Sequence, residues 1–103
     1  MSSYDAYEEL KILKPDLSMD EKRQLIAEAI HFKIEGELLL IGAPYMTVVD
    51  KIGAYGSENW RQALDRCEDE TVEEIFKFCA FVIIAMYEKA EKFANQAFHI
   101  TDR

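Results

Sequence analysis

Glu28 and His31 have the residue types and the spacing of a metal-ligand pair. They form an E-x-x-H sequence, which places both side chains on the same side of a helix, as in the di-iron sites of ferritin-like bundles. Such a site needs a second E-x-x-H and further carboxylates, which a symmetric dimer would have to supply. Both residues also lie in the middle of the polar side of their predicted helix, where charged residues are expected without any metal. We therefore predict no metal and no cofactor, and keep Glu28 and His31 as a weak alternative metal pair.

The other side chains that could bind a metal or act as nucleophiles follow no catalytic motif. Cys67, Cys79, His31 and His99 show no CxxC or HxxxH spacing. The chain also contains neither a glycine-rich phosphate-binding motif nor the GxSxG turn of hydrolases. Both cysteines fall in predicted helices, and we expect reduced thiols among apolar side chains. The sequence thus predicts a protein that is not an enzyme.

An acidic run is the most distinctive surface feature of the sequence. Within ten residues it contains six acids, opposed only by Arg66: Asp65, Glu68, Asp69, Glu70, Glu73 and Glu74. One interpretation is a solvated loop whose carboxylates favour the positive N-terminus of the next helix. The other is a docking surface for a basic protein partner, since complementary charge speeds association and fixes orientation.

The composition is that of one small folded domain, residues 1–103. The 103 residues are half hydrophobic and 31% charged, and the chain is too short for two domains. Twenty acidic residues against 12 basic ones give a formal charge of −8, which argues against binding to nucleic-acid backbones or anionic membranes. The longest apolar run, residues 78–87, is ten residues long, whereas roughly 20 are needed to cross a bilayer. Since residues 1–17 lack the features of a secretory signal, we expect an intracellular, cytoplasmic protein.

The strongest predicted element is a long helix over residues 72–98. This stretch contains no glycine or proline, and Thr71 and Glu74 have the spacing of a capping box at its start. At about 1.5 Å per residue the helix would be about 40 Å long. The sequence therefore predicts an all-α fold, a small bundle of four to five helices around this C-terminal helix.

Three shorter helices are predicted to pack against it. One covers residues 4–13 and stops before Pro15. A second opens with a capping box at Ser18 and Glu21 and keeps helical spacing as far as Ile34, with Lys22 and Lys33 unexplained inside its apolar arc. A third begins at residue 58 after Ser57, and its buried stripe has the i, i+3, i+4, i+7 spacing: Trp60, Ala63, Leu64 and Cys67.

Residues 36–57 are the least regular part of the chain. The apolar run 38–41 fits either a strand or a buried helix, because so short a run has no readable period. Ala43-Pro44 reads as a break. Residues 46–54 fit a short helix with one apolar side, formed by Val48, Val49 and Ile52.

The middle of the long helix is apolar on both sides. Phe81 and Ile84 interrupt its polar stripe, with Tyr87 at the edge, so something must cover them. Either a second copy does so in a homodimer, which we slightly favour, or the N-terminal helix does so through Tyr7 and Leu10.

Two functions follow as hypotheses. The first is a small acidic interaction module that binds or inhibits a basic protein, by analogy with immunity and inhibitor proteins. The second is a small oligomeric subunit or carrier, with a metal or small-molecule site between protomers.

Overall fold

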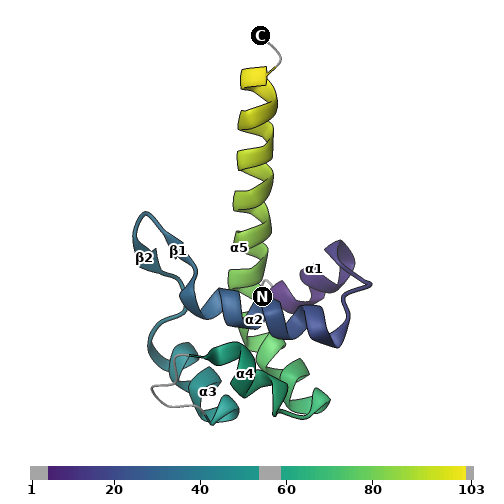
Figure 1. Ribbon diagram of the computed structural model, residues 1–103, viewed down its shortest axis with the longest axis vertical. Helices are drawn as coiled ribbons and strands as arrows, with labels where there is room; N and C mark the ends of the chain where they lie inside the picture. Colours follow the sequence, from purple (N-terminus) through teal and green to yellow (C-terminus); the bar gives the residue numbers. More distant parts are fainter. Residues whose placement is uncertain (1–4, 54–58, 102–103) are drawn as a thin grey trace.

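The computed structural model describes residues 5–53 and 59–101, the last seven of these as helical backbone. Its five helices are α1 (Ala6–Leu13), α2 (Met19–His31), α3 (Gly42–Ile52), α4 (Trp60–Asp65) and α5 (Asp69–Thr101). Figure 1 shows α1 to α4 gathered around the lower half of α5, while its upper half projects from them. The prediction of an all-α bundle around one long C-terminal helix is confirmed.

Helix α5 provides the centre of the hydrophobic core. In its lower half Val72, Ile75, Cys79 and Ile83 are fully buried, and α1, α2 and α3 pack against it. Residues 88–94 are all exposed, because the other helices do not reach that far. No helix in the described part of the chain is both long and apolar enough to cross a membrane.

The start of α5 differs from the prediction. The helix begins at Asp69, and the backbone N–H of Val72 already donates to Glu68 O at 3.0 Å. Thr71 therefore lies inside the first turn and cannot cap the helix, so the predicted Thr71–Glu74 capping box is wrong. Asp69 and Glu70 occupy the first turn instead, where carboxylates are stabilised by the helix dipole.

The start of α2 was predicted correctly, but its end was not. Ser18 and Glu21 exchange both hydrogen bonds of a capping box, each at 3.0 Å. The helix ends at His31, and a small antiparallel hairpin follows, formed by β1 (Lys33–Ile34) and β2 (Glu37–Leu38). Its two-residue turn has positive φ at Glu35 (53°) and Gly36 (82°), the geometry of a tight hairpin turn. The predicted extension of the helix to Ile34 is therefore wrong, because Lys33 and Ile34 form β1.

The following segment contains two corrections. Helix α3 begins at Gly42, four residues before the predicted start, and its apolar residues Val48, Val49 and Ile52 are buried as predicted. Pro44 does not break it, because a proline in the first helical turn lacks only an N–H that needs no partner there. The ambiguous run 38–41 enters the hairpin at Leu38 and then buries Leu40.

Helix α4 presents its predicted stripe to the core. Trp60, Ala63 and Leu64 are buried and Cys67 is half-buried. Asn59 caps the helix by accepting the backbone N–H of Gln62 at 2.9 Å. The predicted cap Ser57 lies outside the described residues.

Helix α1 runs along the side of α5 where a homodimer contact was considered. The Tyr7 ring meets Phe76 edge-on at 6.4 Å between centroids, and the Lys14 ammonium lies 4.8 Å from the centroid of the Tyr87 ring. Ile84 is only 4% exposed and belongs to the same core cluster as Leu10. This fits the alternative in which the N-terminal helix covers this side of α5 within one chain. Of the three predicted contact residues only Phe81 is well exposed, at 42%.

Candidate functional site

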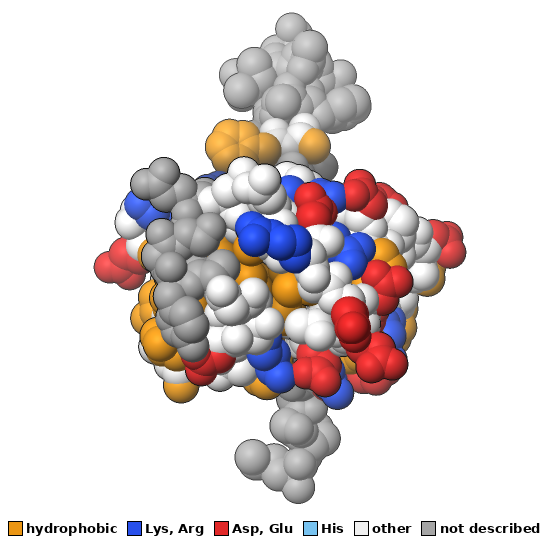
Figure 2. Space-filling model, turned by 60° about the horizontal axis from the view of Figure 1, so that its bottom comes forward, with side chains coloured by type: hydrophobic (Ala, Val, Ile, Leu, Met, Phe, Trp, Pro, Cys, Tyr) orange, Lys and Arg blue, Asp and Glu red, His pale blue; other side chains and the backbone are white. Residues whose placement is uncertain are grey.

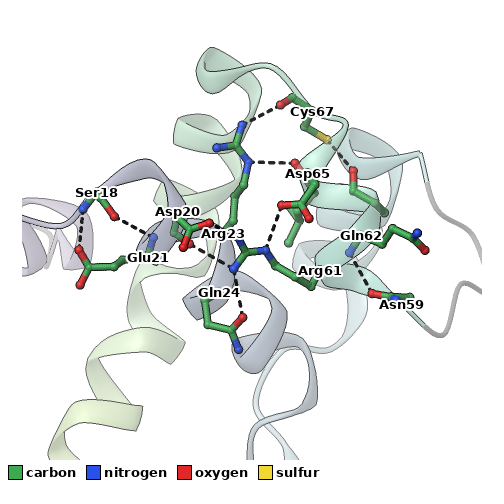
Figure 3. Close-up of polar contacts among 12 residues, drawn as sticks. Ser18, Asp20, Glu21, Arg23, Gln24, Asn59, Arg61, Gln62, Asp65 and Cys67 are labelled. Carbon is green, nitrogen blue, oxygen red and sulfur yellow. Dashed lines mark hydrogen bonds and ion pairs between the residues drawn. The ribbon is translucent and has the colours of Figure 1, made fainter.

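Arg23 of α2 joins the end of α4 to the start of α5. Its guanidinium donates to the carbonyl oxygens of Leu64 at 3.1 Å and Cys67 at 2.9 Å, and to Asp69 Oδ1 at 3.0 Å. Figure 3 shows this side chain reaching across to the corner between the two helices. Leu64 O also accepts the backbone N–H of Cys67 at 3.0 Å, so Arg23 adds a side-chain donor to the C-terminal end of α4 and holds one acid of the acidic run.

Arg61 makes a second link, from α4 to α2. Its Nε donates to Asp65 at 3.0 Å, and its other nitrogens donate to Gln24 at 3.1 Å and to the Asp20 carboxylate (Figure 3). These carboxylates, Asp65 first, raise the pKa of the Arg61 guanidinium. Asp20 is brought next to the acidic run from 45 positions earlier in the chain.

Glu73 lies where α1, α2 and α5 meet. One of its oxygens accepts from Lys22 Nζ at 2.6 Å, and the other accepts from the Tyr7 hydroxyl at 2.6 Å. Burial alone would raise the pKa of Glu73, but the hydrogen bonds from Lys22 and Tyr7 outweigh it and lower the pKa below its usual range. Lys22, unexplained by helical spacing, is therefore placed by this ion pair.

In the ion pairs of the acidic run, the basic side chains are less exposed to solvent than the acidic side chains. The side chains of Arg23, Arg61 and Lys51 are 15–31% exposed, whereas their partners Asp20, Asp65, Asp69 and Glu74 are 53–79% exposed. We call the exposed carboxylates the acidic corner: Asp20, Asp65, Glu68, Asp69, Glu70 and Glu74. Figure 2 shows acidic side chains gathered along one side of the face at the base of the molecule.

The six residues of the predicted acidic run thus have three different environments. Glu73 is inside the junction described above. Asp65, Asp69 and Glu74 are paired but exposed, the last with Lys51 at 2.7 Å. Among residues 5–53 and 59–94, Glu68 and Glu70 have no ion-pair partner. Sequence reasoning missed Asp20, because nothing in the local sequence links it to α4.

The Tyr7–Glu73 contact has a consequence for stability at high pH. The hydrogen bond to Glu73, with burial, raises the pKa of Tyr7 to about 12. A raised pKa means that the folded state holds this proton more tightly than the unfolded state, so its stabilisation is complete below pH ~10 and is lost as pH rises through about 12. We expect Tyr7→Phe to make unfolding by urea less sensitive to pH between about 10 and 12. Tyr45→Phe, on α3, is the control, and an equal change in both variants would contradict this role.

A second surface feature is a groove between α2 and α5. It is lined by Leu25 and Phe32 from the α2 side and by Met86, Tyr87 and Phe93 from α5. Glu28 and His31 line the same groove, so the predicted metal pair does share one surface. No group of three or more possible metal ligands occurs among the described residues, and the side chain of His99 lies outside them.

The cysteines are both free thiols in the structure. Cys79 is buried in the core, and burial raises its pKa to about 12. Cys67 is half-buried with a raised pKa, again chiefly through burial, although Arg23 and Arg66 act in the opposite direction. A raised pKa keeps both thiols protonated at neutral pH, which disfavours nucleophilic chemistry.

Comparison of the chain with protein-family models, curated proteins and solved structures gave no match.

Proposed function

We propose that this chain is a non-enzymatic interaction module, of the immunity or inhibitor type, that acts inside the cell by docking a basic protein partner on the acidic corner. One observation carries the proposal. The bases of the corner lie beneath the acids, so an approaching molecule meets carboxylates even though most of them are ion-paired. Glu68 and Glu70 add two charges without partners among the described residues.

The arrangement suits recognition because the carboxylates are held in place before binding. Arg23 and Arg61 each hold an acid on the surface, and each has a half-buried side chain. Less side-chain freedom then remains to be lost when a partner binds. The formal charge of −8 adds a long-range attraction for cationic surfaces, which acts mainly on the association rate.

Neutralising the two unpaired acids should slow the capture of a cationic molecule. We expect Glu68→Gln combined with Glu70→Gln to lower the association rate with a lysine-rich probe peptide by about threefold to tenfold at low salt. The folding free energy should stay nearly unchanged, because neither carboxylate has an ion-pair partner among the described residues. Stopped-flow binding at several salt concentrations measures the effect, and urea unfolding checks stability.

The matched control removes the same charge from another place. Glu35→Gln combined with Glu37→Gln changes the exposed hairpin and leaves the acidic corner intact. If both double variants slow association equally, net charge alone is responsible and the corner is not a docking surface. For the natural partner, a photo-crosslinking residue at Glu70 should trap a basic protein that the same residue at Glu37 does not.

The carrier hypothesis remains as a second proposal because Glu28 and His31 line one groove. If that groove binds metal with a second copy's residues, purified protein should contain stoichiometric metal, and Glu28→Gln should remove it. Elemental analysis of the purified protein distinguishes this function from the first.

A further inference from the structure

The projecting half of α5 continues the spacing of the half that is buried. Along one side of the helix, apolar residues recur at alternating intervals of four and three: Cys79, Ile83, Met86, Ala90 and Phe93, followed in the sequence by Ala97 and Ile100. Such 3-4 spacing is typical of a helix that pairs with another helix. Cys79 and Ile83 find their partners within the chain, whereas Phe93 is 63% exposed.

The sizes of these residues show what kind of helix would fit. Large residues, Met86 and Phe93, alternate with small ones, Ala90 and Ala97. In an antiparallel pair of identical helices, each position with a large residue faces a position with a small residue on the other helix. Ala90 would then face Phe93 of the second copy. In a parallel pair each residue would face its own copy, which puts alanine on alanine and leaves voids.

The surroundings of the helix leave room for such a partner. The groove between α2 and α5 opens beside Met86 and Tyr87 and has apolar side chains, Leu25 and Phe32, on its α2 side. Antiparallel pairing would bring the end of the second copy's α5 to this groove. In the same register Lys89 comes opposite Ala94 of the second copy, so it meets no like charge at that position.

We infer that the projecting half of α5 binds the same segment of a second copy, antiparallel, with its end in the α2–α5 groove. The contact is isologous, which means that the same residues of both copies form the interface. This inference goes beyond the proposed partner binding and uses the opposite end of α5 from the acidic corner. It also differs from the contact predicted from sequence, since Ile84 is buried within the chain.

Sedimentation of the full chain tests the contact. We expect the wild type to sediment as a dimer when the protein concentration is raised to about 0.5 mM. Phe93→Glu should give a folded, helical monomer, since Phe93 is largely exposed in the single chain. Phe81→Glu, on the other exposed side of α5, is the control and should remain dimeric. A monomeric wild type would overturn the inference, as would a dimer that Phe81→Glu dissociates and Phe93→Glu does not.

A distance measurement tests the orientation. A spin label at Lys77→Cys, with Cys67→Ser to remove the half-buried thiol, marks an exposed position on α5. In the antiparallel register the two labels are separated along the helix by about 40 Å, at about 1.5 Å per residue. A parallel pair would bring them within roughly 20 Å. The longer distance is expected, and the shorter one would overturn the antiparallel arrangement.

Discussion

Ile84→Glu is expected to destabilise the folded chain strongly at 25 °C. Ile84 is 4% exposed within the core cluster, and none of the described residues places a buried polar side chain there to pair with a carboxylate. An unpaired buried charge costs at least about 4 kcal/mol, a large part of the roughly 5–15 kcal/mol that stabilises a domain of this size. Circular dichroism and urea unfolding measure the loss.

Phe81→Glu is the matched control for this variant. It introduces the same charge three residues earlier on α5, at a side chain that is 42% exposed, and should cost about 1 kcal/mol or less. If Ile84→Glu were to melt within a few degrees of Phe81→Glu, the side chain at 84 would have to be accessible, and α1 could not be covering that side of α5.

Arg23→Met is expected to lower the free energy of unfolding by about 2–3 kcal/mol. Methionine keeps the apolar stem but loses all three hydrogen bonds, to Leu64 O, Cys67 O and Asp69 Oδ1. Leu64 O would keep only its backbone donors and Cys67 O would lose the Arg23 donor, so the connection between α4 and α5 would weaken. The midpoint of urea unfolding, read by tryptophan fluorescence from Trp60, measures the change.

The control for Arg23 is Arg66→Met, which removes the same charge from an exposed position at the end of α4. It should change stability by less than about 0.5 kcal/mol. Arg23→Lys should lie between wild type and Arg23→Met, because an ammonium keeps the charge but not the fork of donors. Equal stabilities of the Arg23→Met and Arg66→Met variants would show that Arg23 is only a surface ion pair.

Features that depend on neighbouring residues were predictable from the sequence. The Ser18–Glu21 capping box joins residues three apart, and the stripe on α4 repeats within two turns. The absence of glycine and proline after residue 71 was enough to predict one long helix. Local rules also misled, since Thr71 and Glu74 have capping spacing although the helix already starts at Asp69.

Features that depend on distant residues were not predictable. The hairpin required positive φ at Glu35, a residue that rarely adopts it, so helical spacing through Ile34 was the more natural interpretation. The acidic run was found, but the bases beneath it come from far along the chain. Lys22 and Glu73 are 51 positions apart, and Arg23 and Asp69 are 46 apart. Sequence alone therefore suggested charge without showing which acids are held in place.

The order of the helices has a consequence for synthesis on the ribosome. Helix α5 contacts α1, α2 and α3 but follows all of them in the chain. At roughly 5–20 residues per second, the apolar faces of the earlier helices wait on the order of ten seconds for their main partner. A nascent chain that stops near residue 68 has no such partner, so the earlier helices are expected to pack stably only after α5 has emerged.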